Sequence, residues 1–189
     1  MTAHAVEAST SRAVIDRPYS GTSLQRGKTM LLINRILCPV DFFPASDKAV
    51  QYAADLAADY GGKIHLLHVV SPAIPIGQEY AINTAEIMNS IEEASKSQMK
   101  KLVADLKARE VDVTSEVRTG NVHQVIEEVI SAVKPDLIVM GSDARSRIER
   151  FFMGSVAEWL TRNSPVPVLV ISGKYRSAKG RKRPEKRVA

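Results

Sequence analysis

Short apolar runs alternate with amphipathic stretches along the central part of the chain. Apolar runs of this length are typical of strands that are buried on both faces of a sheet. The predicted strands are 35–41, 63–70, 111–118, 136–140 and 166–171. The segment 111–118 differs, because its apolar and polar residues alternate, which favours a strand near the edge of a sheet.

Helices are predicted between these strands, at about 49–60, 80–108, 122–133 and 155–163, because apolar residues recur there at helical spacing. Gly61-Gly62 ends the first helix, Asn121 is a candidate N-cap of the third, and Lys134-Pro135 ends the third. In the first two helices the residues expected to face inward are Ala49, Ala53, Leu56, Ala57, Tyr60, Ile87, Ile91, Leu102 and Leu106. The third helix has the most regular face, made of Val122, Val125, Ile126, Val129, Ile130 and Val133.

The order of these elements predicts an α/β fold, a single doubly wound five-stranded parallel sheet of Rossmann-like type with helices on both faces. The crossovers of such a sheet are right-handed. Its ligands bind outside the carboxyl ends of the strands, at the point where the strand order reverses. The candidate site residues are therefore those that come just after each strand.

The composition divides the chain into one domain, expected at 35–172, and two tails. Residues 1–34 are rich in Ser, Thr, Ala and Gly and have no sustained period, so we expect a disordered extension. Residues 173–189 contain eight Lys or Arg against one Glu, and this basic tail is also expected to be disordered. Because the tails carry the excess positive charge, the net charge of +5 does not indicate a nucleic-acid-binding domain, and only weak contact of the tail with nucleic acid is expected.

The remaining global features favour a cytoplasmic protein without a membrane partner. No stretch reaches the roughly 20 apolar residues of a membrane span, and the chain does not start with a basic segment followed by an apolar one, as a secretory signal does. The single cysteine, Cys38, excludes an internal disulfide and is expected to be a buried core residue. His65 and His68 have no neighbour at metal-ligand spacing, so they are interpreted as packing or edge residues, and no metal site is predicted.

The segment from Gly141 to Ser155 has the features of a phosphate-binding loop. Gly141 follows a predicted strand and allows the backbone to approach a ligand closely. Gly154 and Ser155 open the next predicted helix, where free N–H groups and the helix dipole attract anions. The sequence therefore predicts a phosphate site along this loop.

The stretch IVMGSDARSRIERFFMGSVAEWLTRNSPVPVLVIS resembles the C-terminal signature of the universal stress protein family. The family's nucleotide motif is Gly, two residues, Gly, nine residues, Gly, then Ser or Thr, and the matching positions are Gly141, Ala144, Gly154 and Ser155. RILCPVDFFPASDKAV resembles the family's first strand and helix, and LLHVV its second strand. The resemblance extends over about 35–172 and implies the same α/β fold.

The resemblance also implies an adenine-nucleotide site. On the adenine and ribose side it assigns Pro39, Val40, Asp41 and, through its backbone, Val69. On the side of the ribose and phosphates it assigns Met140, Gly141, Ala144, Gly154, Ser155 and Val156.

The sequence departs from the family's motif at Ala144, which replaces a glycine, and at Asp143, where the family often has His. A methyl group can crowd a phosphate, and a carboxylate repels one unless it faces solvent or a bound Mg²⁺. Arg145 and Arg147 can compensate by pairing with phosphate oxygens. We therefore predict ATP, alone or with Mg²⁺, as the ligand. The alternatives are a cyclic AMP binder and a ligand-free dimeric interaction module with a decayed site.

No catalytic residue is predicted, because the chain lacks the Gly-Lys-Ser/Thr motif and a recognisable Ser-His-Asp arrangement. The expected function is that of a dimeric stress-response regulator and not of an enzyme. The last predicted strand, from Val166 to Ile171, is apolar, and an exposed edge of this kind needs a cover. The resemblance implies that the same strand of a second copy covers it in a homodimer.

Overall fold

The computed structural model describes residues 33–72, 84–142 and 154–176. By its contacts the chain divides into Met1–Leu31 and Leu32–Ala189, and the described residues all belong to the second unit. Most of the predicted N-terminal extension, residues 177–189 of the predicted tail, and both Ala144 and Arg145 lie outside the described residues.

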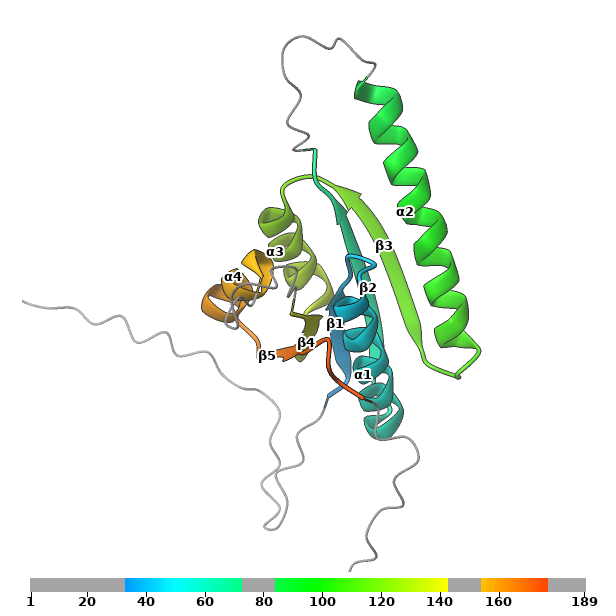
Figure 1. Cartoon of the computed structure of the whole chain (residues 1–189). Helices are drawn as coiled ribbons and strands as arrows, with labels where there is room; N and C mark the ends of the chain where they lie inside the picture. Colours follow the sequence, from blue (N-terminus) through cyan, green and yellow to red (C-terminus); the bar gives the residue numbers. More distant parts are fainter. Residues whose placement is uncertain (1–32, 73–83, 143–153, 177–189) are drawn as a thin grey trace, which may run out of the picture. The chain divides into compact units, whose positions relative to one another are not determined.

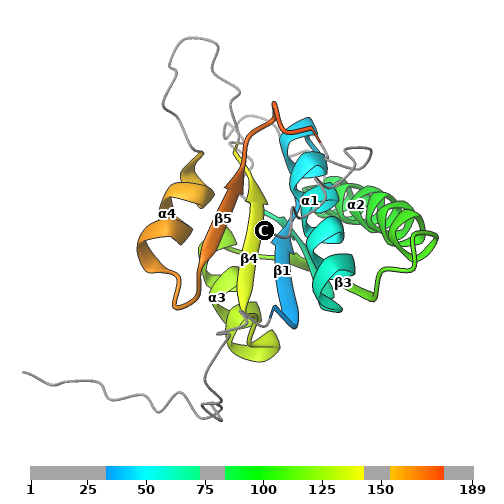
Figure 2. The ribbon, with the colours of Figure 1, turned by 90° about the horizontal axis from the view of Figure 1, so that it is seen from below.

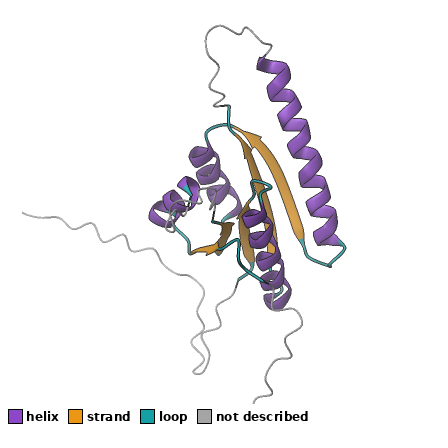
Figure 3. Cartoon of the chain, viewed as in Figure 1, coloured by secondary structure: helices purple, strands orange, loops and turns teal. Residues whose placement is uncertain are grey.

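Strands and helices alternate along the described parts of the chain (Figure 1; Figure 3). The strands are β1 (Arg35–Pro39), β2 (Lys63–Val70), β3 (Val113–Thr119), β4 (Leu137–Gly141) and β5 (Val168–Ile171). The helices are α1 (Pro44–Tyr60), α2 (Thr84–Lys107), α3 (Val122–Val133) and α4 (Ser155–Asn163). The described helices include none that is long and apolar enough to cross a membrane.

All neighbouring strands pair in parallel, in the order β3-β2-β1-β4-β5. The chain moves outward from β1 to β3 and then crosses to the other side of β1 to add β4 and β5. The strand order therefore reverses between β1 and β4, and β3 and β5 are the two edges of the sheet. The predicted doubly wound, five-stranded parallel sheet is confirmed.

Each face of the sheet is covered by two helices (Figure 2). One core joins α1 and α2 to side chains such as Ile36, Cys38 and Ile64, and the other joins α3 and α4 to Leu37 and Ile138. Cys38 is fully buried, as predicted, and this burial raises the pKa of its thiol to about 12. It is therefore an inert packing residue at neutral pH.

The predicted helix boundaries at glycine, asparagine and proline are confirmed. Gly61 ends α1 in the left-handed conformation, with φ of 69°. The side chain of Asn121 caps α3 by accepting hydrogen bonds from the N–H groups of His123 and Gln124. Lys134, just before a proline, ends α3 in the left-handed region.

Three predicted inward-facing residues are exposed instead, which corrects the sequence analysis. Tyr60 is 51% exposed because it is the last residue of α1, and Ile87 and Ile91 of α2 are 37% and 40% exposed. The 24 residues of α2 span about 36 Å, whereas the seven residues of β3 beneath it span about 23 Å. The amino-terminal part of α2 therefore extends past the strand, and its apolar stripe has no sheet to cover.

The chain remains packed beyond β5. Tyr175 contacts the first core, and its ring meets Tyr52 of α1 edge-to-face at 5.0 Å between centroids. Its N–H donates to the Ser172 carbonyl at 2.8 Å. These contacts extend the packed part of the chain past residue 172, the predicted end of the domain.

Candidate functional site

A pocket of about 180 Å³ opens at the carboxyl ends of β1, β2 and β4. The strand order reverses between β1 and β4, so the pocket lies at the carboxyl end of the sheet at this reversal point. Ligands of doubly wound sheets bind at such a point. The lining residues are Pro39, Val40, Asp41, Ser46, Leu67, His68, Val69, Val122, Ile126, Met140, Gly141 and Val156.

The structure brings most of the predicted site residues together around this pocket. The predicted residues that line it are Pro39, Val40, Asp41, Val69, Met140, Gly141 and Val156. Gly154 and Ser155 are not lining residues, but they precede Val156 at the start of α4. Ala144 and Arg145, with Asp143 and Arg147, lie outside the described residues.

Sequence reasoning missed five lining residues: Ser46, Leu67, His68, Val122 and Ile126. Leu67 and His68 lie within β2, where the resemblance assigned Val69 alone, and the search from the strand order was directed to residues that follow the strands. Val122 is the first residue of α3 and comes soon after β3, at the carboxyl end of the sheet. Its position after a strand could therefore have marked it as a candidate. Ser46 and Ile126 enter through the packing of α1 and α3, for which the sequence has no local signal.

The walls of the pocket are mostly apolar. Val40, Leu67, Ile126 and Met140 are each less than a tenth exposed, and Val122 and Val156 pack beside them. Asp41, Ser46 and His68 contribute the polar side chains among the lining residues. A mostly apolar pocket with a few polar groups is typical of a site for a small organic ligand.

Pro39 helps to open the sheet at this point. The carbonyl of Arg35 accepts from Asp136 toward β4, and Pro39, four residues later, faces the same way. Because Pro39 has no N–H, it has no hydrogen bond to donate to β4. The β1–β4 pairing stops at Leu37, whereas β1–β2 pairing continues to Pro39. β1 and β4 are thus unpaired at the mouth of the pocket.

Asp41 holds the turn that leads from β1 into α1. Its Oδ1 accepts from the N–H of Phe43 at 3.0 Å, and its own N–H donates to Oγ of Ser46 at 3.2 Å. Phe42 between them has φ of 61°, a conformation that is strained for a bulky residue. The resemblance assigned Asp41 to the adenine and ribose side of the site, and in the structure Asp41 lines the pocket and also holds this turn.

Gly141 is required by the close approach of α1. A Cβ atom at this position would lie 2.5 Å from the carbonyl carbon of Ala45 and 2.6 Å from the nitrogen of Ser46. Both are backbone atoms at the start of α1, so rotation of a side chain does not relieve the clash. The sequence analysis attributed this glycine to ligand approach, and the structure adds a packing reason.

Val69 presents main-chain groups to the pocket. The Leu67 carbonyl accepts from Val40 toward β1 at 2.8 Å, and the Val70 carbonyl accepts from Gly120 toward β3 at 3.0 Å. Successive residues of a parallel strand bond to opposite neighbours, so the N–H and C=O of Val69 point to the side of β1. β1 has already ended at this level, and the two groups therefore face the pocket.

The first turn of α4 contributes to the pocket through Val156. Gly154 precedes the helix with φ of 84°, which favours glycine, and it supplies no side chain to cap the first N–H groups. Ser155 is exposed, and Val156 reaches the pocket. The positive end of the helix dipole therefore lies beside the pocket.

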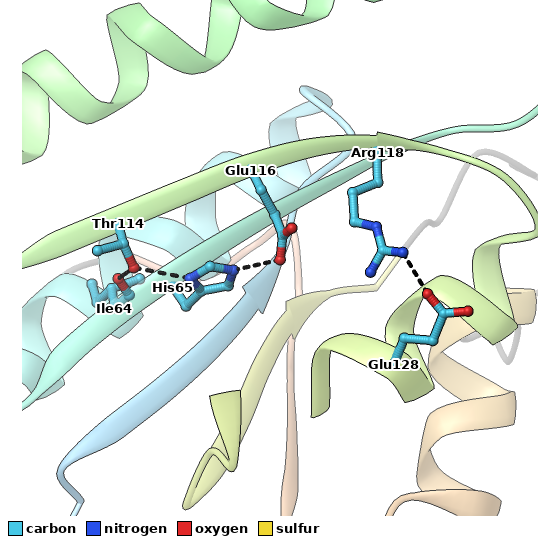
Figure 4. A network of polar contacts seen from close by, with 6 residues as sticks. All are labelled: Ile64, His65, Thr114, Glu116, Arg118 and Glu128. Carbon is cyan, nitrogen blue, oxygen red and sulfur yellow. Dashed lines mark hydrogen bonds and ion pairs between the residues drawn. The ribbon is translucent and has the colours of Figure 1, made fainter. Parts of the chain in front are cut away.

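A second polar cluster lies away from the pocket, across β2, β3 and α3 (Figure 4). His65 bonds to Oγ1 of Thr114 and to Oε1 of Glu116, both at 2.9 Å, and Arg118 pairs with Glu128 of α3. These pairs hold the edge strand β3 to β2 and to α3. His65 itself lies on β2, an inner strand of the sheet, so its interpretation as an edge residue is wrong. Among the described residues, no group of His, Cys, Asp and Glu could hold a metal ion.

The sequence matches one known family and its members. The profile of the Universal stress protein family matches residues 33–172. Universal stress protein G of Escherichia coli O157:H7 is 30% identical over 139 residues, which cover 72% of this chain and 96% of that protein.

Solved structures that contain adenine nucleotides share the fold. A universal stress protein family protein from Arabidopsis thaliana with AMP bound has a TM-score of 0.56 and 19% identity, and the match covers 77% of this chain and 94% of that one. A universal stress protein in complex with cAMP has a TM-score of 0.53 and 22% identity, with 75% and 98% covered. At these identities the similarity establishes the fold.

Proposed function

The chain belongs to the universal stress protein family, and we propose that it binds an adenine nucleotide, with ATP as the first candidate, in the pocket at the carboxyl ends of β1, β2 and β4. In this proposal the protein is a nucleotide-responsive regulator in the cytoplasm and not an enzyme. The AMP and cAMP complexes of two proteins with the same fold support this choice of ligand.

The observation that carries the proposal is the pair of main-chain groups that Val69 presents to a mostly apolar pocket. Adenine presents an acceptor, N1, beside a donor, its N6 amino group, on its Watson–Crick edge. An N–H and a C=O on one residue match this pair, as in other proteins that recognise a base along that edge. Leu67, Ile126 and Met140 offer apolar surface for the faces of the ring.

The phosphates are proposed to extend toward α4. Val156, at the start of that helix, lines the pocket, and the N-terminus of a helix attracts anions. Gly154 leaves this N-terminus open, because it has no side chain. The predicted contacts of Ala144 and Arg145 belong to the same side of the site.

Bound nucleotide is expected to stabilise the protein against unfolding. At a concentration of 100 times the Kd, ATP should add about 2.7 kcal/mol to the free energy of unfolding. Urea denaturation of protein from which nucleotide has been removed, with and without Mg-ATP, measures this difference. No change at millimolar nucleotide overturns the proposed function and leaves the ligand-free dimeric module as the better description.

The affinities for different nucleotides distinguish the possible ligands. The described residues that line the pocket include the groups proposed to face adenine, but no Lys or Arg. The preference for a mono-, tri- or cyclic phosphate must therefore come from contacts elsewhere in the site. Calorimetric titration with ATP, AMP and cyclic AMP ranks them, with GTP as the control for the base. Tighter binding of cyclic AMP than of ATP would make cyclic AMP the proposed ligand in place of ATP.

We also propose that two copies of the chain pair through β5. The carbonyl of Pro167 accepts from Ile138 of β4, and that of Ile171 accepts from Ser142, which follows β4. The main-chain groups of Val168 and Val170 therefore point outward from the edge of the sheet. The side chains of Val168, Leu169 and Val170 are partly buried, whereas that of Ile171 is buried. An edge of this kind, unpaired among the described residues, pairs readily with a second strand.

Val170→Pro tests this interface, because it removes an outward N–H and leaves the bonds between β4 and β5 in place. Loss of the N–H in both copies is expected to weaken a dimer roughly 10–100-fold. Sedimentation analysis over a range of concentrations measures the change. Val170→Ala, which keeps the N–H, is the matched control and should remain dimeric. A monomeric wild-type protein at high concentration overturns this proposal without affecting the nucleotide site.

A further inference from the structure

We propose that His68 is a positioning residue of the pocket, which engages the Val40 carbonyl and thereby keeps the N–H of Val69 available to the base. His68 has this role only if the pocket binds the nucleotide proposed above. It lines the pocket, and its Nδ1 lies 2.8 Å from the carbonyl oxygen of Val40.

The alternation of the β1–β2 ladder shows what this contact replaces. The N–H of Val40 donates to the Leu67 carbonyl, so both main-chain groups of Val40 face β2. If the ladder continued by one more bond, the Val40 carbonyl would accept from the N–H of Val69. In the structure the described pairing of β1 with β2 ends at Pro39, and the imidazole of His68 takes the place of that donor.

The contact determines which ring nitrogen of His68 carries a proton. A carbonyl oxygen can only accept, so Nδ1 must be the donor, and Nε2 of the neutral ring is an acceptor. The Nδ1–H form of His68 is therefore a direct and testable consequence of the arrangement.

The ring of His68 is also held by the strained turn after β1. Phe42, with φ of 61°, packs its ring against the imidazole at 4.5 Å between centroids, with the planes tilted by 39°. The turn begins directly after Val40, and the described pairing of β1 with β2 has already ended at Pro39 and Leu67, so the ladder does not extend to Val69. The turn and the imidazole together stop the ladder one bond early.

Loss of the imidazole leaves the Val40 carbonyl without its donor. The N–H of Val69 is the group that a continued ladder would supply, and pairing of the two would remove the donor that faces the base. If the two groups do not pair, the carbonyl is left unsatisfied beside the base, which also weakens binding.

His68→Leu tests the role, because leucine fills similar space without a donor. We expect its Kd for ATP to rise about tenfold, the usual effect of one hydrogen bond. His68→Asn places an amide nitrogen at the same number of bonds from the backbone as Nδ1, and it should restore affinity to within about threefold of the wild type. Calorimetry measures both, and urea denaturation without nucleotide checks that the variants fold.

His65→Leu is the matched control. It is the same substitution on the same strand, but His65 bonds to Thr114 and Glu116 away from the pocket, so the Kd should not change. If wild-type protein binds ATP and His68→Leu binds equally well, the role of His68 is wrong while the proposed function stands. If the wild type binds no nucleotide, the proposed function itself is overturned, and the role of His68 with it.

Nuclear magnetic resonance provides a readout without nucleotide. The ¹⁵N shifts of the imidazole should show His68 protonated at Nδ1 in the free protein, and the Nε2–H form would contradict the proposal. Hydrogen exchange at the Val69 amide should be slower in His68→Leu than in the wild type, because the Val40 carbonyl then becomes its acceptor. Equal or faster exchange counts against this pairing.

Discussion

Gly141→Ala is expected to lower the free energy of unfolding by roughly 3 kcal/mol, at the upper end of the usual cost of overpacking. The added methyl group would lie within 2.6 Å of the carbonyl carbon and oxygen of Ala45 and the nitrogen of Ser46. Because all three are backbone atoms, α1 as a whole must move away from β4. Urea denaturation of the two proteins measures the difference.

Gly173→Ala is the control, since it adds the same methyl group beside the same residue. Its Cβ would lie 3.8 Å from Cβ of Ala45, an ordinary van der Waals distance, so its stability should stay within about 0.5 kcal/mol of the wild type. Equal stabilities of the two variants would show that α1 can shift without cost. If α1 does shift, the pocket changes with it, since Ser46 and Gly141 both line it.

Val156→Glu is expected to weaken ATP binding about 100-fold or more. Val156 lines the pocket on the side where the phosphates are proposed to extend, and a carboxylate at about 4 Å from a phosphate costs about 4 kcal/mol in the partly screened environment near a protein surface. The fold should persist, because an acidic residue in the first turn of α4 interacts favourably with the helix dipole. Calorimetric titration measures the Kd.

Thr161→Glu provides the comparison for charge alone. It adds the same carboxylate to α4, at an exposed residue outside the pocket lining. Its Kd for ATP should match that of the wild type within about twofold, since exposed charges at a distance are screened by salt. Unchanged binding by Val156→Glu would move the phosphates to another part of the pocket and contradict the proposed direction.

Local patterns were sufficient to predict where most elements lie. β2 spans the predicted residues from Lys63 to Val70, and α4 spans those from Ser155 to Asn163. These boundaries depend on neighbours in the sequence, such as glycine after α1 or a cap before α3, and their physical causes act over a few residues. β1 and β5 are shorter than predicted, because strand pairing, and not apolar character, determines where a strand ends.

The exposure of individual side chains was predicted less well. Ile87 and Ile91 continue the apolar stripe of α2, yet they are exposed because β3 is too short to lie beneath them. Tyr175 belongs to a segment that reads as a charged tail, yet it packs on Tyr52. In both cases the decisive quantity is the length or position of an element that is distant in the sequence.

The sequence by itself determined the element order, the parallel α/β fold and the residues that follow β1, β2 and β4, because periodicity and motif spacing are local properties of the chain. Only the tertiary structure decided how those residues act. The start of α1 explains why position 141 is glycine, and the early end of β1 turns the main-chain groups of Val69 toward the pocket. The contact of His68 with Val40 joins residues that are 28 positions apart, and such contacts arise only when the strands assemble.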